Sequence, residues 1–148
     1  MENPKDYGFN SQLIHYSGHH DHYGSATVPI YQTSTFAFES AQDGADCFAG
    51  VKPGYMYTRI GNPTVKALER QVALLEHAYD SVAVASGMAA VSTVYLGLLN
   101  AGDHVVSSSA VYGASRVLME QHMSRFGVES TYVNTADLDA VKAAMRPN

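Results

Sequence analysis

The stretch that decides the fold is Asp80-Ser-Val-Ala-Val-Ala-Ser-Gly-Met-Ala-Ala-Val-Ser-Thr-Val-Tyr-Leu-Gly-Leu-Leu99. It opens with a valine-rich apolar run, Val82–Ala85, which predicts a buried strand. Ser86-Gly87 breaks the extended pattern. From Met88 to Leu99 apolar residues recur at helical spacing, and Asn100-Ala101-Gly102 ends the helix. The pattern therefore predicts a strand that turns directly into a helix.

Such a turn can bind an anion. The first N–H groups of a helix have no partner within the helix, and they lie at the positive end of its dipole. Gly87 leaves room for a ligand to approach them. The same residues also suit an ordinary strand–helix connection, because the dinucleotide fingerprint and the P-loop lysine are both absent.

The chain continues in the same alternating pattern. Residues 103–108 and 128–133 predict two more strands, and helices are expected from Gly113 to about His122 and after Thr135. Strands that alternate with helices favour right-handed crossovers and a parallel sheet. Functional loops then follow the carboxyl ends of the strands, where Ser86-Gly87-Met88 and Tyr112-Gly113 lie. The predicted class is α/β.

Composition excludes several classes. A chain of 148 residues with a net charge of −5 is at most one ordinary domain and lacks the basic surface of a nucleic-acid-binding protein. No apolar run is long enough to span a membrane, and the first residues do not resemble a signal peptide. Cys47 stands alone, so no internal disulfide can form. We expect a cytoplasmic protein.

Two features of the first 60 residues allow a functional and a plain interpretation. His15, His19, His20, Asp21 and His22 are chemically suited to a metal, but adjacent loop residues rarely converge on one ion, so no metal site is predicted. Cys47 could be a nucleophile, although its place in an apolar helical stretch, Ser40–Phe48, favours a packed thiol.

The loop Gly54–Thr64 is the second informative stretch. Asn62 suits a helix N-cap and Pro63 the first helical position. The helix that follows carries Val65, Leu68, Val72 and Leu75 on one face, which predicts packing on a sheet. Before it, Tyr57 and Arg59 stand two positions apart in an extended segment, where a hydroxyl and a guanidinium can close on one phosphate.

Four motifs occur in order: Val28–Phe36, Tyr57-Thr-Arg-Ile-Gly-Asn-Pro-Thr64, Ser86-Gly-Met-Ala-Ala90 and Tyr112-Gly113. Together they resemble the Cys/Met-metabolism family of pyridoxal-phosphate enzymes, and the match spans nearly the whole chain. Tyr7–Asn10, Cys47–Gly50 and Phe126-Gly127 are most similar to the branch that eliminates a thiol from methionine. The resemblance implies an aminotransferase-like (fold type I) domain with a mostly parallel sheet. Residues 1–60 would form an extended arm and dimer-contact loop, and 61–148 the first part of the cofactor-binding α/β domain.

The resemblance also assigns site residues. Gly87 and Met88 would donate backbone N–H groups to the phosphate of pyridoxal 5'-phosphate. Tyr57 and Arg59 would reach across a dimer interface to the phosphate of a neighbouring subunit, in a homodimer or a tetramer built from dimers. Tyr112 would stack on the pyridine ring and act as the acid that protonates the leaving group.

The implied activity is γ-elimination from L-methionine or a related sulfur amino acid, which gives an α-keto acid, ammonia and a thiol. Ala114 departs from the cysteine usual in that branch, so γ-replacement on O-acetylhomoserine or transsulfuration of cystathionine stays open. The family's covalent lysine and its pyridinium-binding aspartate match nothing in this chain. We therefore expect an N-terminal part of a longer enzyme, inactive alone, and a non-catalytic role for the isolated chain is the third alternative.

Overall fold

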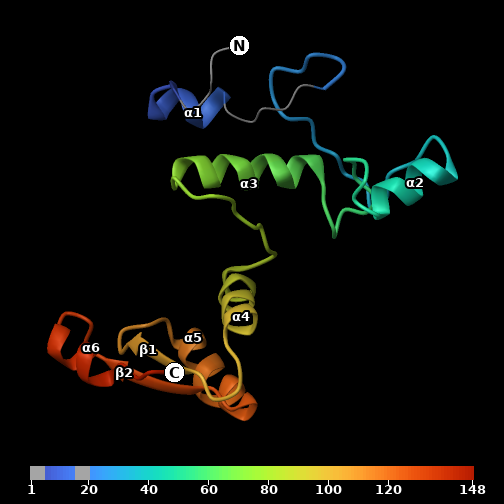
Figure 1. Cartoon of the computed structure of the whole chain (residues 1–148). Coiled ribbons are helices and arrows are strands. Elements are labelled where there is room, and N and C mark those ends of the chain that lie inside the picture. The colour runs from blue at the N-terminus through green and yellow to red at the C-terminus, as the bar shows by residue number, and fades with distance from the viewer. Residues whose placement is uncertain (1–5, 16–20) are drawn as a thin grey trace. The chain divides into compact units, whose positions relative to one another are not determined.

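The chain forms two compact units, Met1–Ala83 and Val84–Asn148 (Figure 1). The computed structural model describes residues 6–15 and 21–148. This division is defined by contacts between residues. The division at residue 60, which the sequence suggested, separates a proposed arm from a proposed cofactor-binding domain, and it stays a prediction.

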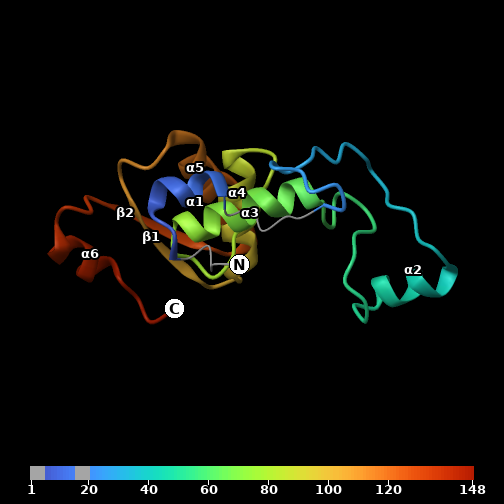
Figure 2. The same ribbon diagram turned by 90° about the horizontal axis from the view of Figure 1, so that it is seen from above.

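The first unit contains three helices, α1 (Phe9–His15), α2 (Ala41–Phe48) and α3 (Pro63–Leu75). Figures 1 and 2 show α1 lying beside α3, and Ala67 and Ala73 are the buried apolar residues of α3 besides Pro63. The sequence predicted a different buried face. Val65, Leu68 and Val72 are instead 38%, 57% and 40% exposed.

The reason for this error is the absence of a sheet from the described part of this unit. The backbone pairing seen between residues 21 and 83 is one isolated antiparallel bridge, Thr35 to Tyr57. The stretch Tyr31–Phe38, which has a high content of β-forming residues, therefore makes one bridge rather than a strand. Without a sheet to cover it, this apolar face of α3 stays partly exposed.

The second helix begins as the sequence predicts. Ser40 caps α2 by accepting a hydrogen bond from Asp43 N at 3.0 Å. Cys47 is 7% exposed and contacts the chain at Gly54, where a Cβ atom would lie 2.7 Å from the Cys47 Sγ. The thiol is therefore packed against the loop that leads to Tyr57, as its apolar surroundings favoured.

The second unit follows the predicted alternation. It runs through α4 (Gly87–Leu98), β1 (His104–Ser108), α5 (Gly113–Val117), a π-helical turn η2 (Leu118–His122), a 3-10 turn η3 (Met123–Phe126), β2 (Glu129–Val133) and α6 (Leu138–Ala144). The strands β1 and β2 pair in parallel, with His104 opposite Glu129 and Ser108 opposite Val133. The predicted parallel crossover is therefore confirmed for these two strands.

A small core holds the crossover on the sheet. Met119, Met123 and Val128 are buried, and Tyr95, Leu99, Val105, Leu118 and Tyr132 pack around them. The chain reverses after η3 at Gly127, whose φ of +80° suits glycine. A Cβ there would also approach the Ala101 Cβ to 3.2 Å, which ties this turn to the end of α4.

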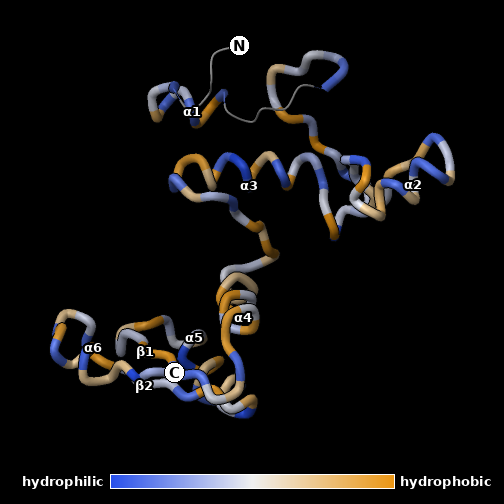
Figure 3. Tube along the Cα trace, in the orientation of Figure 1, coloured by the Kyte–Doolittle hydropathy of each residue, from blue (hydrophilic) through white to orange (hydrophobic). Residues whose placement is uncertain are grey.

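Two predictions for the opening stretch need correction. Val82–Ala85 forms no ladder, and Val82 and Val84 are 77% and 40% exposed. The helix α4 has no buried residue, and Figure 3 shows hydrophobic colour on successive turns of it. A strand needs a hydrogen-bonded neighbour, and no described segment pairs with this one. The apolar content of this segment therefore predicted a buried strand wrongly, because strand pairing and burial both depend on a neighbouring segment.

None of the helices within residues 6–15 and 21–148 combines the length and the apolar character that crossing a membrane requires.

Candidate functional site

The turn Ser86-Gly87-Met88 begins α4 in the predicted way. Ser86 is extended, and its hydroxyl accepts a hydrogen bond from Ala89 N at 3.1 Å. Among the described residues, none accepts a hydrogen bond from Gly87 N or Met88 N. A Cβ at Gly87 would have no heavy atom within 4 Å. The turn therefore presents two backbone donors at the positive helix end, with open space beside them.

Tyr112 lies at the start of α5, directly after the loop that follows β1. Its side chain is 70% exposed, and its carbonyl accepts from Arg116 N. Three residues further on, the buried Ser115 places its hydroxyl 3.8 Å from the Met88 sulfur. The beginnings of α4 and α5 therefore lie together, although only α5 follows a strand of the sheet.

Tyr57 and Arg59 occupy one loop of the first unit. Tyr57 forms the bridge to Thr35, and its carbonyl accepts from Ile60 N at 2.9 Å and Gly61 N at 3.0 Å. Arg59 therefore lies inside a turn and not in the extended segment that the sequence predicted. Its guanidinium carbon is 5.3 Å from the centre of the Tyr57 ring, so the two side chains do lie together.

These two side chains line one side of an open hollow of about 810 Å³. Residues 30–34 form the other side, and Asn62 and Thr64 also contribute to the lining. Asn62 is 3% exposed and does more than cap α3. Its amide nitrogen also donates to Tyr31 O, 31 positions away in the sequence, a role that the cap signal in the sequence does not indicate.

Two of the described lysines, Lys52 and Lys66, form ion pairs. Neither pair involves a predicted site residue. Lys66 lies 3.2 Å from Asp80 and 3.3 Å from Glu69, and hydrogen bonds to these carboxylates raise the pKa of its ammonium group. Lys52 is paired with Asp43, whose hydrogen bond and charge likewise raise the pKa of Lys52. Neither amine therefore has the lowered pKa that makes a lysine nucleophilic near neutral pH.

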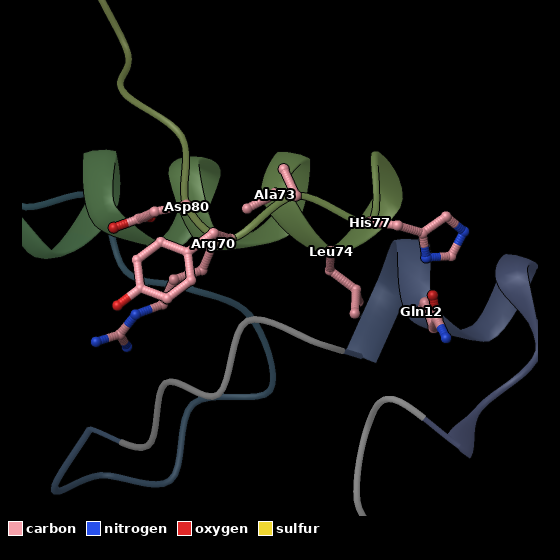
Figure 4. A pocket seen from close by; sticks show the side chains of 8 residues that line it. Gln12, Arg70, Ala73, Leu74, His77 and Asp80 are labelled. Carbon is pink, nitrogen blue, oxygen red and sulfur yellow. The ribbon is translucent and has the colours of Figure 1, made fainter.

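Another hollow, of about 320 Å³, lies between α1 and the end of α3 (Figure 4). Gln12 of α1 faces Leu74 and His77, while Arg70 and Asp80 lie toward its other end. The Ser81 N–H and the ammonium of Lys66 lower the pKa of Asp80, so this carboxylate is charged. None of the predicted site residues lines this hollow.

The histidine cluster is described only in part, since His19 and His20 lie outside the described residues. Asp21 accepts hydrogen bonds from the backbone and hydroxyl of Ser25, which lower the pKa of its carboxyl group. Within residues 6–15 and 21–148, no three His, Cys, Asp or Glu side chains gather closely enough to hold a metal ion.

Comparison with known proteins agrees with this description. A sequence profile described as "Cys/Met metabolism PLP-dependent enzyme" matches residues 10–148. The chain is 46% identical over 144 residues to an L-methionine gamma-lyase from Fusobacterium nucleatum subsp. polymorphum, covering 97% of this chain and 36% of that protein. It is 38% identical over 148 residues to an O-acetyl-L-homoserine sulfhydrylase from Corynebacterium glutamicum, covering 99% of this chain and 34% of the other.

A solved structure gives the same result. Cystathionine gamma-lyase from Lactobacillus plantarum, complexed with L-serine, superposes with a TM-score of 0.80 and 39% identity over 95% of this chain and 35% of that one. The fold and its turns thus define an α/β protein of the aminotransferase-like, fold type I class, which confirms the predicted fold class. More closely, the chain belongs to the Cys/Met-metabolism family of PLP-dependent enzymes. It spans about a third of the length of the relatives it matches.

Proposed function

We propose that this chain supplies the phosphate-binding part of a pyridoxal-phosphate enzyme that cleaves a carbon–sulfur bond in L-methionine or a related sulfur amino acid. The observation that carries the proposal is the turn at Gly87 and Met88. Its two N–H donors are without partners among the described residues, and the space beside Gly87 is open. A phosphate dianion fits this combination of donors, helix dipole and room.

Tyr57 and Arg59 are the proposed second set of phosphate ligands. A guanidinium and a phenol held side by side in an exposed loop can form charge-assisted hydrogen bonds to one phosphate. The family resemblance assigns them to the site of a neighbouring subunit. We therefore propose a homodimer, or a tetramer of two dimers, in which each site takes its phosphate ligands from two chains.

Tyr112 is the proposed catalytic residue. Its ring is 70% exposed at the start of α5, so it is free to stack on the cofactor ring and to present its hydroxyl to a substrate. The bound cofactor supplies the electron sink for carbanion chemistry at the substrate. In γ-elimination the bond from Cγ to sulfur breaks, and the Tyr112 hydroxyl donates a proton to the departing thiolate. Water then completes the release of ammonia and an α-keto acid.

Two related activities stay as alternatives. Ala114 follows Tyr112-Gly113 where the methionine-cleaving branch usually has a cysteine, and the chain also resembles an O-acetyl-L-homoserine sulfhydrylase. In γ-replacement, an incoming thiol adds to the position that the leaving group has vacated. The likeness to a cystathionine gamma-lyase extends the alternatives to transsulfuration. All of these reactions use the same phosphate ligands and the same acid.

The test is a chimera in which this chain replaces the matching 144 residues of the Fusobacterium L-methionine gamma-lyase. Thiol release is measured with L-methionine, and product formation with O-acetylhomoserine plus sulfide. We expect thiol and α-keto acid in equal amounts from methionine. A folded chimera that binds the cofactor and forms only the replacement product would overturn the lyase assignment in favour of the sulfhydrylase.

The chain alone is expected to lack activity. Carboxylates paired with Lys66 and Lys52 raise the pKa of both amines, and Lys142 lies within the helix α6. Addition of pyridoxal phosphate, reduction with borohydride and peptide mass spectrometry measure covalent capture directly. We expect no lysine to be labelled stoichiometrically. One fully labelled lysine together with methionine-dependent thiol release would show that the chain carries a complete site.

A further inference from the structure

A network of side-chain hydrogen bonds joins two segments of the first unit that are distant in sequence. The Asn62 amide nitrogen donates to Tyr31 O at 2.9 Å and to Thr58 Oγ1 at 3.0 Å. The Thr64 hydroxyl accepts from Tyr31 N at 2.9 Å and donates to Pro29 O at 2.8 Å. We call these bonds, made by Asn62 and Thr64 to residues 29–31 and to Thr58, the arm clamp.

The arm clamp has a buried amide at its centre, and both the oxygen and the nitrogen of this amide have hydrogen-bond partners. Asn62 is 3% exposed, and its oxygen accepts from Thr64 N at 2.9 Å while its nitrogen makes the two bonds named above. Thr58 extends the network, because its hydroxyl donates to Thr33 O and its N–H donates to Ser34 O at 2.9 Å. A polar network around a buried amide, in which each bond supports its neighbours, favours one backbone conformation.

The clamp holds the residue that lies between Tyr57 and Arg59. Thr58 is bonded on one side to the arm and on the other to Asn62, so the Asn62 amide helps to fix the turn that carries Tyr57 and Arg59. Helix capping needs only the Asn62 oxygen. The two bonds from the nitrogen are therefore additional to what capping needs.

We propose that Asn62 is a positioning residue for cofactor phosphate, acting through Thr58 on Tyr57 and Arg59. The proposal rests on the proposed function, because it assumes that Arg59 binds phosphate. Asn62 touches neither cofactor nor substrate in this role. It lowers the entropic cost of ordering the Tyr57–Arg59 loop, because a side chain that is held in place before the phosphate binds loses less freedom on binding.

Serine separates the two roles of Asn62. Ser is about as good an N-cap as Asn, so Asn62→Ser keeps the start of α3 and removes the donor to Tyr31 and Thr58. Thr64→Val breaks the other half of the clamp without altering Asn62, and Thr64→Ser restores the hydroxyl. Ser40→Ala is the matched control, because it removes the cap of α2 in the same unit and leaves the clamp intact.

The first measurement compares pyridoxal phosphate with pyridoxal, which lacks the phosphate, by equilibrium binding to the chimera. We expect Asn62→Ser and Thr64→Val to weaken binding of the phosphorylated form about tenfold, as the loss of about one or two net hydrogen bonds implies. Binding of pyridoxal should change less than twofold. Thr64→Ser and Ser40→Ala should leave the ratio of the two affinities unchanged.

The second measurement needs no cofactor. In the 148-residue chain, Asn62→Ser should speed hydrogen exchange at Thr58 N and Tyr31 N, which lie in the network. Exchange at Lys66 N, which bonds to the Asn62 carbonyl in α3, should stay as it is. Equal acceleration at all three amides would mean that serine has unfolded the helix start, and would overturn the separation of roles.

Arg59→Ala tells the two possible failures apart. If Arg59→Ala weakens phosphate-dependent binding and the two clamp variants do not, the positioning role is wrong and the proposed function stands. If Arg59→Ala also leaves the affinity ratio unchanged, the phosphate role of the loop is wrong. If Asn62→Ser weakens both ligands equally, Asn62 is a structural residue only and the proposal is overturned.

Discussion

The two proposed phosphate-binding regions are built in opposite ways. At Gly87 and Met88 the donors belong to the backbone, and one local cap from Ser86 suffices to form the turn. At Tyr57 and Arg59 the donors belong to side chains, and the turn that carries them is held by bonds to residues 29–36. The first region is defined within a few residues of sequence, and the second depends on a distant segment.

This difference has a consequence for how each region can fail. A backbone turn is insensitive to most side-chain changes but sensitive to anything that fills the space in front of it. A side-chain site held by a network loses its geometry when any member of the network is removed. Substitutions should therefore act locally at α4 and at a distance in the first unit.

The largest expected effect tests whether the two regions serve different subunits. Two inactive chimeras are mixed, one carrying Arg59→Ala and the other lacking the lysine that binds the cofactor in the Fusobacterium part. If Arg59 serves the neighbouring site, hybrid dimers contain one intact site. Random exchange then restores about a quarter of the parental activity. Absence of recovery, after subunit exchange has been confirmed by mass spectrometry, would place Arg59 in its own subunit's site.

The next effect concerns chemistry rather than binding. Tyr112→Phe keeps a ring that can stack but removes the proton donor. General acid catalysis typically contributes about a hundredfold or more, so kcat for thiol release should fall by that order. Cofactor affinity should change little, because the ring is retained. An unchanged kcat would remove the acid role from Tyr112 while leaving its stacking role in place.

A smaller effect tests the open space at the start of α4. Gly87→Val should weaken cofactor binding about tenfold or more by blocking the approach to two charge-assisted bonds. Gly97→Val is its matched control, since both glycines lie in α4 and neither has a heavy atom within 4 Å of a built Cβ. Both changes cost similar helix propensity. Equal losses of cofactor affinity in the two variants would argue against a phosphate at Gly87.

Local signals in the sequence predicted the beginnings of the elements well. Asn62 caps α3 as the sequence predicted, and Ser40 and Ser86 lie where helices were expected to begin, because a cap involves residues only two or three positions apart. Gly127 was likewise expected as a turn and has a positive φ. For the same reason, the Ser86–Met88 part of the candidate site could be predicted from sequence.

Burial and long-range contacts could not be predicted in this way. Val82–Ala85 has the composition of a buried strand, yet it stays exposed because pairing depends on a neighbour that the described residues do not supply. The second function of Asn62 was missed because its partner Tyr31 lies 31 positions away. The helix after Gly113 was expected to be regular, but it passes through π and 3-10 turns where Met119 and Met123 enter the core.

The smallest predicted effect concerns the start of the loop that leads to Tyr57, where Gly54 contacts α2. A Cβ at Gly54 would lie 2.7 Å from the Cys47 Sγ, and Cys47 is 7% exposed, so Gly54→Ala forces the thiol or the loop to move. Because a single methyl group meets the end of one side chain, we expect a loss near the lower end of overpacking costs, about 1 kcal/mol. Hydrogen exchange at Val51 N, which bonds to Asp46 O at the end of α2, reports this loss in the intact chain.

Cys47→Ala provides the control, because it removes the sulfur that the new methyl group meets. In that background Gly54→Ala should cost little, so the two changes should couple by about 0.5 kcal/mol or more. Simple additivity would mean that the loop tolerates the methyl group by moving away from α2. In that case faster exchange should extend along the chain to Thr58 N. Gly54 would then be needed to keep the loop in position, and not to make room for the thiol.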